Sequence, residues 1–189
     1  MKKVLTLLGS PQKSGNTAKV LSLFEARIKS DLDVERINIC ELTIHGCLGC
    51  YACQRESNIP GCVQKDDAET VFGKFMAADA VIYASPLYCW GFTAQLKAFI
   101  DRHYCFGKGY GSDTFKSLIA GKPTALLVTC AGAIEGNADL IQVAFERLNE
   151  FYSTRIIGKY LLPYCKSPEE IGENGIRIAE KMANDFRYI

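Results

Sequence analysis

Hydrophobic residues along this chain alternate between short continuous runs and longer stretches with helical spacing. The runs predict strands at residues 4–8, 34–39, 80–85, 123–129 and 156–162. The first, third and fourth runs are almost wholly apolar, as strands buried on both faces of a sheet are. Apolar residues three or four positions apart predict a helix after each strand. The first helix covers residues 17–30, and the second is opened by Asp66 and Asp67. The third carries Phe92, Leu96, Phe99 and Ile100, and the fourth carries Ile141, Ala144, Phe145 and Leu148. The last helix begins near residues 167–168.

The alternation of strands and helices predicts an α/β fold. Right-handed crossovers between parallel strands place helices on both faces of the sheet. We expect a single domain over residues 1–189, with a long loop at 40–65 and an irregular, glycine-rich stretch at 105–121. Ligands of such sheets bind beyond the carboxyl ends of the strands, near the point where the strand order reverses. The loops after the first, third and fourth strands are therefore the candidate site.

Composition and charge exclude several classes of protein. The chain has 189 residues, of which 48% are hydrophobic, so we expect a packed core rather than disorder. A formal net charge of +1 gives no general attraction to nucleic acid or to an anionic membrane. No apolar run has the length of a membrane span, and the first run stops at Gly9, too early for a signal peptide. These features predict a cytoplasmic protein that binds neither nucleic acid nor membranes.

The loop after the first strand reads GSPQKSGNT, residues 9–17, and leads directly into a predicted helix. It is not a Walker loop, because no lysine followed by a hydroxyl residue comes after its second glycine. It is not a dinucleotide fingerprint either, because the second glycine of that motif is missing. Its hydroxyl and amide side chains still offer many donors to an anion. The helix start adds free N–H groups and a positive dipole end. This loop favours a phosphate site, and an ordinary helix cap by Asn16 or Thr17 is the alternative.

The loops after the third and fourth strands bring different groups to the same edge of the sheet. SPLYCWGF, residues 85–92, places Tyr88 and Trp90 where a buried strand meets solvent. These rings either stack on a flat cofactor or cover the core, and Cys89 between them is interpreted as a small buried residue. TCAGAIEGN, residues 129–137, is small and rich in main-chain donors. A phosphate cradle, an aromatic turn and a small polar turn together fit flavin mononucleotide (FMN).

Three stretches of the sequence resemble those of NADPH-dependent FMN reductases, a branch of the flavodoxin-like proteins. They are GSPQKSGNT, CLGCYAC with CVQKDD after it, and ASPLYCWGFTAQLKAFIDR, in this order within the first 102 residues. The resemblance implies a flavodoxin-like three-layer sandwich, in which a five-stranded parallel sheet of order 2-1-3-4-5 carries helices on both faces. It also implies a homodimer or homotetramer in which NAD(P)H gives a hydride to bound FMN. The electrons then pass to a small-molecule acceptor such as a flavin or a quinone.

The resemblance further implies which residues hold the cofactor. The phosphate would be held by Ser10, Lys13, Ser14, Asn16 and Thr17. The isoalloxazine ring would be flanked by Pro86, Leu87, Tyr88, Trp90 and Gly91, with Thr129, Cys130, Ala131 and Gly132 nearby. Because the flavin performs the hydride chemistry itself, no catalytic acid or base is required of the protein, and none is assigned.

Four of the nine cysteines cluster in the long loop. Cys47, Cys50 and Cys53 are separated by two residues each, and Cys62 follows after eight more. Three close thiolates and a fourth that returns to them can ligate a [4Fe–4S] cluster, as in iron–sulfur flavoproteins, which look like a sister group of the reductases. Zinc and plain thiols are the other interpretations. We expect structural roles for the scattered Cys40, Cys105, Cys130 and Cys165.

An iron–sulfur cluster would change the functional hypothesis. Without a cluster, the chain is a reductase of small acceptors. With one, it is an electron carrier that passes single electrons between FMN, the cluster and a redox protein partner. An absorbance spectrum of anaerobically prepared protein distinguishes the two hypotheses, because a cluster and a flavin absorb differently.

The remaining charged residues near the aromatic turn are interpreted as structural. Lys97 and Asp101 are spaced for a surface ion pair on a helix, and Arg102 is expected on the same polar side. The two histidines, His45 and His103, have no neighbours in the sequence that suggest a catalytic triad. The candidate chemistry therefore belongs to the cofactors.

Overall fold

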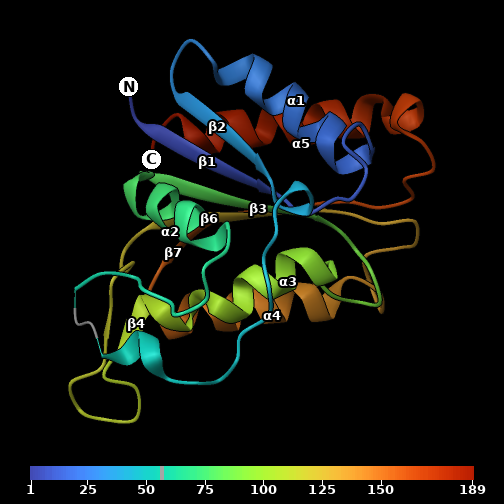
Figure 1. Cartoon of the computed structure of the whole chain (residues 1–189). Helices are drawn as coiled ribbons and strands as arrows, with labels where there is room; N and C mark the ends of the chain where they lie inside the picture. The colour runs from blue at the N-terminus through green and yellow to red at the C-terminus, as the bar shows by residue number, and fades with distance from the viewer. Residues whose placement is uncertain (56–57) are drawn as a thin grey trace.

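A five-stranded parallel sheet forms the middle layer of the structure, a computed structural model that describes residues 1–55 and 58–189 (Figure 1). Its strands are β1 (Lys3–Leu8), β2 (Asp33–Asn38), β3 (Ala80–Pro86), β6 (Pro123–Thr129) and β7 (Arg155–Leu162). They lie side by side in the order β2-β1-β3-β6-β7. Counted along the chain, these are the predicted strands in the predicted order 2-1-3-4-5, so the flavodoxin-like fold is confirmed.

Helices cover both faces of this sheet (Figure 1). One face carries α1 (Asn16–Ile28) and α5 (Gly172–Phe186), and the other carries α2 (Ala68–Ala77), α3 (Ala94–Asp101) and α4 (Asp139–Tyr152). Alternate residues of β1 point to the two layers: Leu5 and Leu7 pack with α2, α3 and α4, whereas Val4 and Leu8 pack with α1 and α5. Because both faces are buried, the central strands are mostly apolar along their length rather than only at every second residue.

Two predicted segments need correction. The stretch at 105–121 is not wholly irregular, because β4 (Gly107–Lys108) and β5 (Lys116–Ser117) form a short antiparallel hairpin. Strands of two residues are too short to give a periodic signal in the sequence. The last helix does not begin at 167–168 as one unit: a 3-10 turn, Pro168–Ile171, comes first, and α5 follows.

Shorter elements and single positions also differ from the expected pattern. The long loop before α2 contains single-turn 3-10 helices at Ile39–Glu41 and Ala52–Gln54, and another, Arg102–Phe106, continues α3. Phe92 precedes α3 instead of lying on it, and Ala144 is exposed on α4 rather than facing the core. Within the described part of the chain, none of the helices combines the length and the apolarity needed to cross a membrane.

Gly9 ends β1 and lies against the start of α3, at the edge of the sheet that carries the candidate site. Its N–H donates to Ala84 O over 2.8 Å, and its carbonyl accepts from the Thr93 hydroxyl at 2.6 Å. A Cβ atom on Gly9 would lie 2.7 Å from Leu96 Cβ and 3.1 Å from Thr93 Oγ1. The glycine therefore lets the first loop pack directly on α3.

We expect Gly9→Ala to lower the free energy of unfolding by about 1–3 kcal/mol, because the added methyl group overpacks this contact. Gly73→Ala is the matched control, since Gly73 is exposed on α2 and a Cβ there meets no atom within 4 Å. The control should raise stability by about 0.5–1 kcal/mol, because alanine is the better helix former. Urea unfolding measures both changes, and equal stabilities for the two variants would contradict the packing described for Gly9.

Candidate functional site

Hydrogen bonds join the three predicted loops at the carboxyl edge of the sheet. The hydroxyl groups of Thr17 and Thr129 lie 2.7 Å apart and connect the first loop to the end of β6. Leu87 N–H donates to Thr129 O at 2.9 Å and connects the loop after β3 to the same strand end. The bond from Thr93 to Gly9 links the start of α3 to the first loop. The three loops therefore form one connected frame.

A cavity of about 240 Å³ lies between these loops. Nine of the fourteen predicted cofactor residues line it, and they come from all three loops: Ser10, Asn16, Thr17, Pro86, Leu87, Tyr88, Thr129, Cys130 and Ala131. The other five are outside the lining: Lys13, Ser14, Trp90, Gly91 and Gly132. The fold thus brings most of the predicted set together in one place.

The first turn of α1 begins at this cavity. Asn16 and Thr17 open the helix, Gly15 precedes them as the N-cap, and no side-chain hydrogen bond caps this end. The alternative of an ordinary cap by Asn16 or Thr17 is therefore wrong. Thr17 is instead paired with Thr129, and Asn16 Oδ1 is buried without a hydrogen-bond partner in the described chain. Uncapped N–H groups attract an anion, so the start of this helix fits a phosphate ester.

Two of the predicted phosphate residues, Lys13 and Ser14, lie outside the cavity lining, and three unpredicted residues belong to it. Lys13 and Ser14 are exposed, and the Lys13 ammonium pairs with the Glu41 carboxylate. The unpredicted lining residues are Gln12, Cys165 and Lys166. Gln12 belongs to the loop already singled out. Cys165 and Lys166 follow β7, whose carboxyl end lies at the same sheet edge, and that position was the available signal for them.

The groups around the cavity do not oppose a negatively charged ligand. Burial raises the pKa of the Cys130 thiol, and burial together with the nearby Cys130 raises the pKa of Cys165 to about 11. Both thiols are therefore neutral at pH 7. The charged residue of the lining is the cationic Lys166. A phosphate ester entering this cavity meets donors and a positive charge.

The aromatic loop after β3 forms a two-residue turn. Tyr88 and Gly91 exchange backbone hydrogen bonds of 3.1 and 3.0 Å, and Cys89 and Trp90 between them have φ of +46° and +61°. Left-handed backbone at non-glycine residues costs on the order of 1 kcal/mol each and is concentrated at functional sites. The prediction that Cys89 is buried is wrong, because the turn exposes it. Tyr88 and Trp90 are 48% and 58% exposed, so two flat rings remain available to a ligand.

The four clustered cysteines line a second cavity, of about 220 Å³, together with residues that follow α3. In residues 1–55 and 58–189, no three His, Cys, Asp or Glu side chains are placed to hold a single metal ion. The zinc interpretation therefore has no support in the geometry. A four-iron cluster takes one thiolate at each corner, so its ligands are spaced more widely than those of one ion. Four thiols in one cavity fit such a cluster by their number and chemistry.

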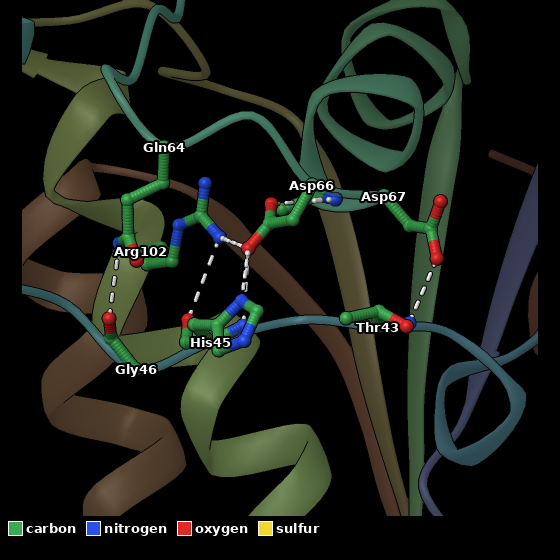
Figure 2. Close-up of polar contacts among 8 residues, drawn as sticks. Thr43, His45, Gly46, Gln64, Asp66, Asp67 and Arg102 are labelled. Atoms are coloured by element: carbon green, nitrogen blue, oxygen red, sulfur yellow. Dashed lines mark hydrogen bonds and ion pairs between the residues drawn. The ribbon is translucent and has the colours of Figure 1, made fainter.

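Hydrogen bonds close the base of the cysteine loop (Figure 2). Thr43 N–H donates to Asp67 Oδ2 at 2.7 Å, and Asp67 N–H donates to Thr43 O at 3.1 Å. Gln64 Nε2 donates to Gly46 O at 3.0 Å. The segment before the first cysteine is therefore fastened to the segment after the last one, which holds the loop that carries all four thiols.

Asp66 connects this base to the end of α3. Its Oδ2 accepts from Arg102 Nη1 at 2.5 Å and from His45 N–H at 3.0 Å, and its Oδ1 accepts from Ala68 N–H at 3.2 Å. The Arg102 and Asp66 side chains are only 1% and 3% exposed. The prediction that Arg102 lies on a polar helix face is therefore wrong, because its partner lies in a segment distant in the sequence.

Electrostatics keep this buried pair ionised. Burial would raise the pKa of Asp66, but hydrogen bonds from His45, Arg102 and Ala68 together lower it. Burial would likewise lower the pKa of Arg102, whereas its bond to Asp66 and the nearby Cys62 give a net increase. Arg102 Nε and Nη2 are buried, and neither has a hydrogen-bond partner among the described residues.

The other charged groups near α3 behave more simply. Lys97 Nζ and Asp101 Oδ1 lie 2.5 Å apart on exposed side chains, so the predicted surface ion pair is confirmed. The His45 ring contacts Asp66, with Nδ1 at 3.3 Å from Oδ2. His103 is fully buried among aromatic rings, and burial lowers its pKa to about 3.

Comparison with known proteins identifies the family. The family model of NADPH-dependent FMN reductases matches residues 2–159. The chain belongs to this family. An iron-sulfur flavoprotein of Archaeoglobus fulgidus is 30% identical over 183 residues, which cover 96% of this chain and 77% of that protein. Another iron-sulfur flavoprotein, from Methanocaldococcus jannaschii, is 33% identical over 101 residues, 53% of this chain and 51% of that protein.

The solved structure of another protein has the same fold as this member of the FMN reductase family. The azoreductase of Bacillus anthracis superposes with a TM-score of 0.75 at 17% identity, and the match covers 100% of both chains. Membership of the NADPH-dependent FMN reductase family makes the chain an FMN-dependent oxidoreductase that uses NAD(P)H. The predicted family, enzyme class and flavin cofactor are therefore confirmed. Cys165 and Lys166 lie beyond the part that the family model matches.

Proposed function

We propose that this protein binds FMN in the cavity between its three loops and reduces small acceptors such as flavins or quinones at the expense of NAD(P)H. The observation that carries the proposal is the uncapped start of α1, which opens onto a cavity lined by all three loops. When bound, FMN supplies the redox chemistry by taking two electrons from NAD(P)H and giving two to the acceptor. The residues of the chain hold and orient it.

The phosphate end of FMN is assigned to the first turn of α1. Main-chain N–H groups at this turn and the side chains of Ser10, Asn16 and Thr17 surround the proposed position. Lys166 lines the same cavity and offers a positive charge to the phosphate.

The ring end of FMN is assigned to the loops after β3 and β6. Pro86, Leu87 and Tyr88 line one part of the cavity, and residues 129–131 line another. The exposed rings of Tyr88 and Trp90 suit stacking against a flat heterocycle. Tyr88 and Trp90 are exposed, so this part of the site would be accessible to the nicotinamide and to the acceptor from solvent.

We expect FMN to bind about 100-fold more tightly than riboflavin, which has the same ring without the phosphate. Two charge-assisted hydrogen bonds from the start of α1 account for about 3 kcal/mol of this difference. Quenching of flavin fluorescence measures both dissociation constants, and anaerobic addition of NADH or NADPH then tests whether the bound flavin loses its absorbance. Equal affinities for FMN and riboflavin would contradict the phosphate assignment.

A second candidate function is supported by the cysteine cavity. The four clustered thiols share one cavity, and Arg102 presents two buried N–H groups that have no partner among the described residues. In this proposal the protein is an electron carrier in which FMN and a [4Fe–4S] cluster exchange single electrons with a redox protein partner. Anaerobic purification should then yield iron and acid-labile sulfide in equal amounts. Flavin absorbance without iron would leave only the reductase proposal.

A further inference from the structure

The guanidinium of Arg102 lies where the cysteine loop meets the end of α3, and it lines the cysteine cavity. Its Nη1 is engaged by Asp66 Oδ2 at 2.5 Å and by His45 O at 3.4 Å. Its Nε and Nη2 have no partner in the described chain, although the side chain is only 1% exposed. Buried guanidinium donors are rarely left unpaired, so their retention at a cavity points to a ligand that accepts them.

Tyr104 provides another unused donor at the same place. Its hydroxyl is buried without a hydrogen-bond partner among the described residues, and its side chain lines the cysteine cavity. The carboxylate in the lining, Asp101, is already paired with Lys97. The cavity therefore combines cysteine sulfurs with N–H and O–H donors, which is the setting of an anionic centre with sulfur ligands.

We propose that Arg102 donates its Nε–H and Nη2–H to the sulfur atoms of an iron–sulfur cluster in the cysteine cavity and so raises the reduction potential of that cluster. This inference rests on the second candidate function, in which the four clustered cysteines ligate the cluster. A cubane with four thiolates is an anion, and one added electron makes it more negative without breaking an iron–sulfur bond. Hydrogen bonds and positive charge therefore favour its reduced form.

Asp66 is the positioning residue in this arrangement. Its carboxylate accepts a hydrogen bond from Nη1 of the Arg102 guanidinium, and it also accepts hydrogen bonds from the backbone N–H groups of His45 and Ala68. Asp66 is not part of the cavity lining, whereas Arg102 is. The positive member of the ion pair therefore lines the cavity, and the negative member does not. Figure 2 shows the two side chains in contact with each other.

The test uses the full chain, reconstituted anaerobically with ferrous iron and sulfide, and measures the midpoint potential of the cluster by redox titration with dithionite. Arg102→Lys keeps the charge and a partner for Asp66 but loses the planar fork. A double variant, Arg102→Met with Asp66→Asn, removes the pair without leaving a buried charge alone. Arg147→Met is the matched control, because Arg147 is an exposed cation on α4. FMN affinity reports on the fold of every variant.

We expect the midpoint potential to fall in Arg102→Lys, to fall further in the double variant and to stay at the wild-type value in Arg147→Met. FMN affinity should be unchanged in all three. A cluster that forms with the same potential in every protein, even at lower yield, would overturn the role of Arg102 and leave the cluster proposal standing. A wild-type chain that takes up no iron and sulfide would overturn both, while its FMN affinity still tests the reductase proposal separately.

Discussion

Asn16→Asp is expected to weaken FMN binding by about 100-fold or more. The substitution preserves the shape of the side chain but places a carboxylate in the first turn of α1, where the phosphate is assigned. At about 4 Å, two unit charges near a protein surface repel by about 4 kcal/mol, and each 1.4 kcal/mol is a factor of about ten in affinity. Fluorescence titration with FMN measures the loss. Riboflavin, which has no phosphate, should lose far less affinity in the same variant.

Asn174→Asp is the matched control for this experiment. It makes the same substitution in the first turn of another helix, α5, at an exposed position outside the cavity. Aspartate near a helix start is favourable to the helix, so neither variant should lose stability. FMN affinity in the control should equal that of the wild type. A similar loss of FMN affinity in both variants, or no loss in Asn16→Asp, would contradict the assignment of the phosphate to the start of α1.

The second large effect concerns His103 and the acid stability of the core. Burial lowers the pKa of His103 to about 3 from an ordinary value of 6.5, and both ring nitrogens lack partners in the described chain. Between these two pH values the unfolded chain binds a proton that the folded protein does not. The free energy of unfolding therefore has its full value above pH 6.5 and decreases as the pH falls toward 3. The loss is about 1.4 kcal/mol per pH unit, on the order of 5 kcal/mol in all.

His103→Leu should abolish this component of acid unfolding. The difference in unfolding free energy between wild type and variant should move in favour of the variant by about 2 kcal/mol from pH 7 to pH 5. Phe106→Leu is the control, since Phe106 is fully buried and its ring lies 5.1 Å from that of His103. Phe106→Leu should lower the free energy of unfolding by the same amount at pH 7 and at pH 5. Parallel pH profiles for the wild type and His103→Leu would contradict a buried neutral histidine.

The fold was readily predicted because the signals for it are local. β1, β3 and β6 are continuous apolar runs, and each helix shows its buried face at helical spacing. The parallel order then follows from the resemblance and from the rules for crossovers. What escaped prediction was short: the hairpin of β4 and β5 has two residues per strand and carries no pattern of its own.

The candidate site was predicted where one loop carries its own chemistry, and missed where partners are distant. Asn16 and Thr17 line the cavity, and they were predicted there because donors and a helix start are adjacent in the sequence. Lys166 belongs to a later loop, and only the shared edge of the sheet places it in the same cavity. Arg102 looked like a surface residue, because its partner Asp66 lies in another segment. Sequence spacing describes neighbours along a helix, but it does not reveal which charge is buried against which.

The crystal structure of the protein grown with FMN tests the central claim most directly. We expect the phosphate within hydrogen-bonding distance of the N–H groups of Asn16 and Thr17. We also expect the isoalloxazine ring between the loop that carries Tyr88 and residues 129–131. A phosphate bound away from the start of α1, or a ring lodged in the cysteine cavity, would contradict it.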